Sequence, residues 1–491
     1  MESYFGRLDF GFNDRYLLTG NARYDGNSMY AEENRWILSY SGVLAWKINN
    51  ESFLRGLNSV NELKLRLSSG LTNRAGGRDY SYASTLTTAS SGLDGGSVAL
   101  VNNDIGNPDL KWEQTTYHNI GLDGAFFNWR VSFSVDFYQR RTDDLAMQIS
   151  LPLYSGTALG TWPPGSLIAP YVNIGSMENK GFDFSISSDI IRGKDFTWKT
   201  DVSVSHNQNK IIKLNAEGAS IDRQYNKTVA GRSLGEFYGY VVEGVFATPT
   251  DFLGDEENGI SPHPRPVRNG EPIPYGTDFG SIWYGDLKFK DINGDGIIDE
   301  SDQTFLGSPL PKVQIGFNNT FTYKNFDLSI FFTSNIGNKV YNVTRKNHED
   351  PQGNRAYFKN VSNYAKLGLV DPDGSASDVN NVYVTNPDTR ISGLRNDQTN
   401  GNQRVTDLYV EDGSFVKCKN ISLGYTLPGS LTQKMHLKSL KVYASATNVF
   451  TITNYSGMDP EIGSWDPLAA GIDNGFYPQP RIITFGLNLS L

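Results

Sequence analysis

Apolar and polar residues alternate with a period of two through most of this chain, and this alternation limits the fold more than any other feature. The last stretch, Arg481–Leu491, shows it most clearly. One face of that stretch carries Ile483, Phe485, Leu487, Leu489 and Leu491, and the other carries Thr484, Gly486, Asn488 and Ser490. Successive side chains of a strand point to opposite faces, so such a strand needs lipid or a protein core on one side and water on the other. The chain is therefore predicted to be all-β.

The same pattern predicts about thirteen strands, joined by connections that alternate between short and long. Short or medium connections are expected near 13–14, 49–61, 127–128, 192–195, 324–325 and 428–438, and long loops near 27–34, 73–111, 142–170, 208–312, 337–412 and 452–479. Antiparallel barrels of the bacterial outer membrane have short turns on the periplasmic side and long loops on the extracellular side. We therefore predict a transmembrane antiparallel β-barrel whose last strand ends in the periplasm.

The composition agrees with a membrane barrel and argues against other classes. Hydrophobic residues make up 38% of the chain, and no run of about 18 apolar residues is present to form a transmembrane helix. The net charge of −9 argues against nucleic acid as a partner. Cys418 is the single cysteine, so no internal disulfide can form. We expect Cys418 on the inward-facing phase of a strand.

An odd number of antiparallel strands does not close a bacterial barrel, and open edges in lipid leave backbone groups unpaired. No secretory signal precedes the first predicted strand, 4–13, although an outer-membrane protein must be exported. Both observations predict that the chain is the C-terminal part of a larger barrel. A truncated gene product and one half of a split transporter remain alternatives.

Several blocks of residues have the identities and the order found in one family of transporters. They are Asp14–Gly26, Asn107–Glu113, Asn173–Gly181, Phe237–Tyr240, Glu243–Phe246, Gly285–Gly296, Asp412–Phe415, Asn448–Phe450 and Asp459–Glu461. Over nearly its whole length the chain resembles the C-terminal half of a TonB-dependent outer-membrane transporter of the SusC/RagA type.

The resemblance implies both a fold and a function. Transporters of this size form barrels of about 22 strands, of which this chain would supply the tenth to the last, without the N-terminal plug. The family imports nutrients across the outer membrane of Gram-negative bacteria of the Bacteroidetes type. A SusD-like surface lipoprotein would cover the extracellular loops, and the TonB complex would supply energy through the missing plug. The ligand would be an oligosaccharide or a peptide.

The predicted loop 208–312 contains a stretch that matches a twelve-residue calcium loop of the EF-hand type. The candidate ligands are Asp291, Asn293, Asp295, the backbone carbonyl of Ile297, Asp299 and Asp302, with Gly296 at the sharp turn. Asp302 is shorter than the usual glutamate, and the residues before Asp291 look extended rather than helical. The alternative is a loop held by its own side-chain hydrogen bonds. A bound Ca²⁺ would be structural and would stabilise this extracellular loop.

Four aromatic residues in the predicted extracellular loops are candidates for stacking on a ligand. They are Trp162, Trp283, Trp465 and Tyr477. Flat rings stack on sugars, but packing within the loops is an alternative for each of them. Aromatic residues near strand ends, such as Trp36, Trp129 and Trp198, are instead expected in the girdles at the two membrane interfaces.

Nothing in the sequence indicates catalysis. The five histidines do not stand at metal-ligand spacing, and neither a nucleophile elbow nor a phosphate-binding loop is present. We therefore expect a transporter and not an enzyme. Two other hypotheses remain: a surface binding protein or adhesin on a barrel anchor, and a soluble all-β glycosidase, which would be recovered without detergent.

Overall fold

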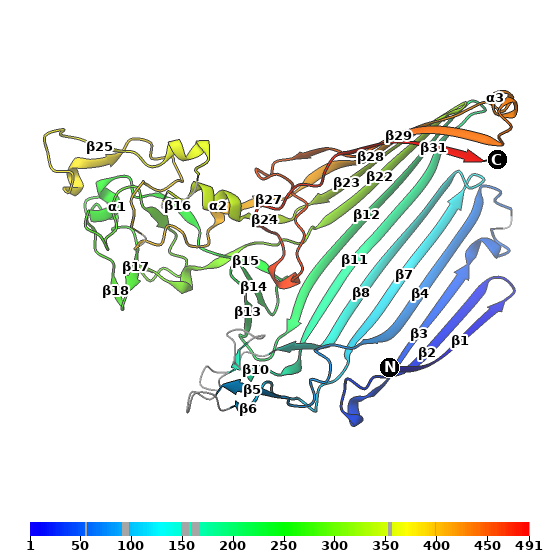
Figure 1. Cartoon of the computed structure of the whole chain (residues 1–491), viewed down its shortest axis with the longest axis horizontal. Helices are drawn as coiled ribbons and strands as arrows, with labels where there is room; N and C mark the ends of the chain where they lie inside the picture. Colours follow the sequence, from blue (N-terminus) through cyan, green and yellow to red (C-terminus); the bar gives the residue numbers. More distant parts are fainter. Residues whose placement is uncertain are drawn as a thin grey trace.

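A single antiparallel sheet organises the molecule, as Figure 1 shows. The computed structural model describes residues 1–54, 56–90, 98–148, 157–158, 167–351, 356–397 and 399–490. In these residues the sheet has thirteen strands, in the order β1 (Glu2–Phe12), β2 (Tyr16–Gly26), β3 (Trp36–Lys47), β4 (Val60–Arg74), β7 (Glu113–Phe126), β8 (Val131–Gln148), β11 (Tyr171–Arg192), β12 (Phe196–Lys213), β22 (Val313–Tyr323), β23 (Phe326–Ile336), β28 (Phe415–Thr426), β29 (Ser439–Thr453) and β31 (Ile482–Ser490). The predicted fold class and number of strands are confirmed.

The short turns all lie at one end of the sheet, the turn end, and the long loops at the other, the loop end (Figure 1). In the turn between β1 and β2, Asn13 and Asp14 both have positive φ, 52° and 51°. These residue types tolerate this conformation well, and it matches the twist of a tight hairpin. Trp129 also has positive φ, 60°, so it lies in a turn, and β8 starts at Val131.

One face of the sheet is continuously apolar. Leu18, Leu44, Leu67, Ile120 and Phe137 are paired in turn across β2, β3, β4, β7 and β8. Residues paired across a ladder point to the same face, and all five are exposed. An exposed apolar surface of this extent requires lipid or another protein to cover it. The opposite face is polar, and we refer to the two as the apolar face and the polar face.

Cys418 lies on the apolar phase, so the prediction that it faces inward is wrong. It pairs with Phe332 of β23 and Phe450 of β29, which both belong to the apolar phase. The register of β28 shifts between Cys418 and Asn420. A β-bulge adds one residue to a strand and reverses the phase of the residues beyond it. Simple alternation counted from Leu423 does not reveal this shift.

The strand β12 reaches Lys213, so the long loop begins at 214 and not at the predicted 208. Residues 208–213 include polar side chains on both faces, because this part of the strand extends beyond the apolar band. Period-two patterning therefore does not detect it.

The long loops contain short strands that form small sheets of their own. These strands are β5 (Leu86–Ser90), β6 (Val98–Asn102), β9 (Thr157–Ala158), β10 (Leu167–Ile168), β13 (Ser220–Asp222), β14 (Asn226–Val229), β15 (Glu236–Gly239), β16 (Val242–Val245), β17 (Arg265–Arg268), β18 (Glu271–Pro272), β19 (Leu287–Phe289), β20 (Ile297–Ile298), β21 (Thr304–Gly307), β24 (Lys339–Asn342), β25 (Leu367–Leu369), β26 (Val382–Val384), β27 (Val410–Asp412) and β30 (Ile472–Asp473). The sheet of β24, β27 and β30 joins two loops at the loop end, the one between β23 and β28 and the one between β29 and β31.

Helices are short and lie outside the main sheet. They are α1 (Pro249–Leu253), α2 (Val343–Glu349) and α3 (Gly429–Lys434), with 3₁₀ turns η1 (Glu32–Asn34), η2 (Ile48–Asn50), η4 (Glu300–Asp302), η5 (Lys359–Asn363), η6 (Val379–Asn381), η7 (Asp407–Tyr409) and η8 (Pro467–Ala469). Among the described residues, no helix is long and apolar enough to cross a membrane.

Candidate functional site: the polar face and the loop lobe

An ion-pair network holds three strands together on the polar face. The guanidinium of Arg66 donates to Asp123 on β7 at 2.8 Å, and to Asp136 on β8 at 2.9 and 3.0 Å. Lys64 lies 2.9 Å from Asp123. These groups are about three-quarters buried, and charge-assisted hydrogen bonds are stronger in such surroundings than in water. The network fixes the register of β4, β7 and β8.

Small hydroxyl side chains cover the polar face nearer the turn end. A shallow pocket there is lined by Ser132, Ser134, Ser185, Ser187 and Ser203, together with Asp201, Gly316, Asn318 and Phe331. Because serine and glycine occupy little volume, this part of the wall stays open and hydrogen-bonding.

Nearer the loop end, side-chain amides connect β8, β11 and β12. The phenol of Tyr138 donates to Asn207 Oδ1 at 3.2 Å. The Nδ2 groups of Asn207 and Asn209 both donate to Asn179 Oδ1, at 3.3 and 2.9 Å. Gly181 lies between these groups, and a Cβ there would overlap the carbonyl of His206 and come within 2.8 Å of the Tyr138 hydroxyl. Only glycine fits at this position.

Two pockets adjoin at the loop end, where β12 and β22 diverge, and both are lined by Leu310 and Pro311. We call them the rim pockets. The first continues along Gln314 and Asn335, whose side chains share the polar face. The second includes Asn207 and Asn209 of the amide group described above. The rim pockets therefore connect with the polar face of the sheet.

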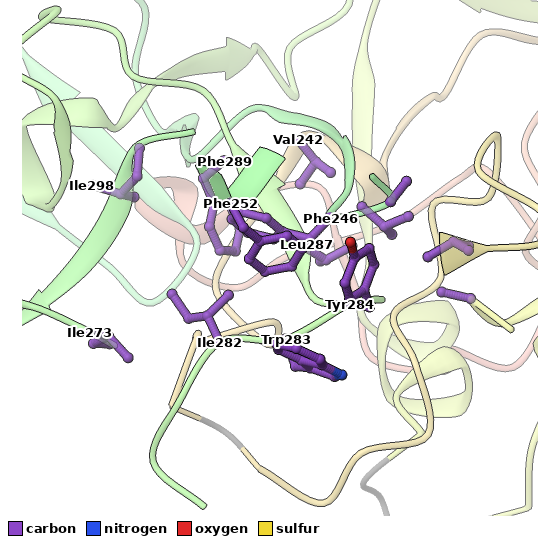
Figure 2. Packing of buried hydrophobic residues seen from close by; sticks show 14 of the residues in the cluster. Val242, Phe246, Phe252, Ile273, Ile282, Trp283, Tyr284, Leu287, Phe289 and Ile298 are labelled. Atoms are coloured by element: carbon purple, nitrogen blue, oxygen red, sulfur yellow. The ribbon is translucent and has the colours of Figure 1, made fainter. Parts of the chain in front are cut away.

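Two of the long loops fold together into one compact unit. Residues 240–298 and 365–408 share a hydrophobic core, and we call this unit the loop lobe. Figure 2 shows its centre, where Phe246, Phe252, Trp283, Tyr284 and Phe289 pack together. The alternation pattern predicts two separate loops here, because contacts between distant segments leave no periodic pattern.

Trp283 belongs to this core and is not available to stack on a ligand. It is 5% exposed, and its ring lies 5.6 Å from Phe252 and 5.3 Å from Tyr284 between ring centroids. The packing alternative is therefore correct for Trp283. Trp465 and Tyr477 are 105% and 88% exposed, so they stay predictions as ligand contacts. Trp162 lies outside the described residues.

A buried carboxylate joins the two halves of the loop lobe. Asp286 is 3% exposed and accepts hydrogen bonds from the Trp283 backbone N–H at 2.9 Å and from Asn402 Nδ2 at 2.8 Å. Arg395 approaches it at 3.3 Å. Burial raises the pKa of Asp286 above its ordinary value, although these hydrogen bonds and the arginine oppose the change. A side chain of this kind is costly to bury unless its partners are in place.

The predicted calcium loop satisfies its carboxylates with backbone groups. Asp291 accepts from the N–H groups of Gly294 at 2.6 Å and Gly296 at 2.9 Å. Burial raises the pKa of Asp291, but these hydrogen bonds outweigh it and hold the pKa below its ordinary value. Asp302 is fully buried, and its oxygens accept from the N–H groups of Ile292 and Asp299, each at 2.8 Å.

The oxygen donors of 291–302 have the right chemistry for Ca²⁺, but the geometry is incomplete. Within the described part of the chain, no group of three or more His, Cys, Asp or Glu side chains comes together to hold a metal ion. Asn293 and Asp295 bond to each other and to the loop backbone. The remaining predicted ligands are Ile297, through its carbonyl, and Asp299, whose carboxylate accepts from Ser301. Calcium binding stays a prediction that rests on the donor types.

Comparisons with known proteins agree with this architecture. A family model described as "TonB dependent receptor-like, beta-barrel" matches residues 1–449. The chain therefore belongs to the TonB-dependent receptor β-barrel family, and it is an outer-membrane protein. The hypothesis of a soluble glycosidase is wrong for this reason.

Two relatives and one solved structure illustrate the family. TonB-dependent receptor P3 of Formosa agariphila is 32% identical, over 99% of this chain and 45% of that protein. TonB-dependent receptor SusC of Bacteroides thetaiotaomicron is 31% identical, over 100% of this chain and 43% of that protein. The RagAB peptide transporter shares the fold, with a TM-score of 0.76 at 23% identity, over 100% of this chain and 47% of that one. The chain thus spans about half the length of these relatives.

The network of Arg66, Asp123 and Asp136 was missed in the sequence. Each residue is charged and stands in the polar phase of a strand, which is a detectable signal. Their proximity depends on the strand register, since Arg66 pairs with Gly121 and Gly121 with Asp136. Sequence alone does not set that register for strands separated by long loops.

Replacing Asp286 with alanine should loosen the loop lobe. Removing one partner of a buried charged network leaves the others unsatisfied, so we expect a local loss of about 3–5 kcal/mol. Hydrogen exchange measured by mass spectrometry should show faster exchange in 240–298 and 365–408, with unchanged protection in the main sheet. The exposed Glu257, replaced with alanine in the same lobe, is the control. Unchanged exchange in the Asp286→Ala variant would show that Asp286 does not hold the two halves of the loop lobe together.

Proposed function

We propose that this protein forms part of a channel for TonB-dependent import of a nutrient across the outer membrane. The observation that carries the proposal is the two-faced sheet, which is apolar on one side and lined with ion pairs, hydroxyls and amides on the other. In a membrane barrel the apolar face meets lipid and the polar face surrounds the transport path. Family membership supports the same function. The proposed role is transport without chemical change of the ligand, so the protein is not an enzyme.

The partners follow from the same proposal. A SusD-like lipoprotein on the cell surface would cover the loop end, where the loop lobe offers a folded surface. The TonB complex of the inner membrane would supply energy through a plug. The ligand would be an oligosaccharide or a peptide. The two relatives are named as TonB-dependent receptors, and RagAB is described as a peptide transporter. Both descriptions are compatible with the proposal.

The proposal is tested by deleting the gene and measuring uptake of fluorescent oligosaccharides and peptides by whole cells. We expect uptake of one ligand class to fall to background in the deletion strain and in a strain that lacks TonB, and to return on complementation. A surface adhesin would bind the ligand in the wild type and in the strain that lacks TonB, without uptake in either. If ligand binding does not need TonB and wild-type cells do not take the ligand up, the import proposal is wrong and the adhesin hypothesis is supported.

The calcium prediction has its own test. Isothermal titration of Ca²⁺ into the purified protein should give a Kd on the order of 10⁻⁴–10⁻³ M, as in other extracellular calcium modules. The Asp295→Asn variant should weaken this binding, because it keeps the oxygen donor but removes a negative charge from the ligand set. Asp373→Asn, an exposed change in another loop, should have no effect. If the titration shows no heat of Ca²⁺ binding, the prediction that residues 291–302 bind calcium is wrong.

A further inference from the structure

The lining of the rim pockets carries more cationic than acidic side chains, on a chain that is acidic as a whole. Their lining includes five cationic side chains, Lys210, Arg232, Lys312, Lys339 and Lys419, and two acidic ones, Glu236 and Glu461. The chain as a whole has a net charge of −9. A local excess of cations on an acidic protein attracts anionic ligands to that place.

Both acidic side chains are already held in ion pairs. Glu236 accepts from Arg232 Nε at 2.8 Å and from the backbone N–H of Ser233 at 3.1 Å. Glu461 accepts from Lys417 at 2.5 Å and from Lys419 at 3.2 Å. They therefore neutralise Arg232 and Lys419 and leave no free carboxylate in the lining for a ligand.

Among the described residues, the cations of the lining that form ion pairs are Arg232 and Lys419. Lys210, Lys312 and Lys339 form none within this part of the chain, and the last two lie one in each of the adjoining pockets. Asp412 pairs with Lys339 in the ladder of β24 and β27. Its Oδ1 accepts from both the N–H and the hydroxyl of Ser414, and these bonds lower the pKa of Asp412 more than the nearby charge of Lys339 does. The ammonium groups of Lys312 and Lys339 are consequently available to a ligand in the two adjoining pockets.

Most of the remaining polar lining is made of side-chain amides, beside the hydroxyls of Ser233 and Ser308. The amides are those of Asn207, Gln208, Asn209, Gln314, Asn335, Asn338 and Gln479. An amide both donates and accepts hydrogen bonds, which suits sugar hydroxyls, since these also do both. Pro309, Pro311 and Ile462 add apolar contact area. The carboxylate terminus of a peptide would also suit these lysines, but its ammonium terminus would find no free carboxylate in the lining. An acidic sugar carries only anionic groups and hydroxyls, so the lining favours a sugar.

We propose that the rim pockets bind an acidic oligosaccharide, with Lys312 and Lys339 contacting its carboxylate or sulfate groups and the amides contacting its hydroxyls. This inference rests on the proposed import function and names its substrate class. The ligand would pass from the rim pockets to the polar face through Asn207 and Asn209, which belong to both. Because the contacts are ionic and exposed, binding should weaken as salt increases.

The test uses the protein purified from outer membranes in detergent, with four probes: tetragalacturonate, a sulfated carrageenan tetrasaccharide, neutral maltotetraose and tetraglutamate. We expect the wild type to bind at least one of the two acidic sugars more tightly than the other probes. The double variant Lys312→Gln/Lys339→Gln should weaken that binding by about tenfold or more, because charged hydrogen bonds are among the stronger contacts of a site. The double change to arginine should preserve it.

The control variant is Lys324→Gln, which changes an exposed lysine in the turn between β22 and β23 at the opposite end of the sheet. It should bind all probes as the wild type does. Unchanged binding of both acidic sugars by the double glutamine variant would overturn the proposal, as would tetraglutamate bound equally well through the same lysines. Uptake assays on the same variants distinguish failure of the rim-pocket site from failure of the proposed import function. If TonB-dependent uptake is the same in the wild type and in the double glutamine variant, the rim-pocket site alone is refuted. If the wild type takes up none of the ligands, the import function itself is refuted.

Discussion

Every strand of the main sheet must pair its backbone N–H and C=O groups with those of its neighbours, while one of its faces stays apolar and the other polar. Inside a membrane an unpaired backbone group costs several kcal/mol, so the ladder has to be continuous. The register then decides which side chains meet, because residues paired across a ladder share a face. The row from Leu18 to Phe137 and the network around Arg66 follow from the same pairings. A slip of one residue would reverse both faces at once.

The sheet also places the loops. The loop between β23 and β28 meets the loop between β29 and β31 in the small sheet of β24, β27 and β30. The same β23–β28 loop shares the core of the loop lobe with the loop between β12 and β22. This arrangement joins a rigid wall to a folded unit beyond the membrane band. The rim pockets lie where wall and loops meet, so their charge and shape depend on both.

Much of this architecture could be predicted from the sequence, because alternation is a local property. The thirteen strands and the short turns were found in this way. The face of the sheet on which Cys418 lies could not be predicted in this way, because a β-bulge shifts the alternation by one residue without changing the composition. The turn position of Trp129 was missed because an aromatic residue with positive φ is unusual. Asp286 contacts Asn402 and Arg395, which lie more than 100 positions away in the sequence, and Trp283 packs on Phe252 within its own loop. No pattern in the sequence indicates such contacts.

The most direct test of the account is the alternation itself, measured along β12 in membranes. With Cys418 replaced by serine, single cysteines would be introduced at Val202, Ser203, Val204 and Ser205 and treated with a charged, water-soluble maleimide. The account predicts that the cysteines at 203 and 205 react and that those at 202 and 204 are protected by lipid and react only with an apolar reagent. Equal reactivity at all four positions, or the reverse pattern, would contradict the assignment of the two faces and the transport path based on it.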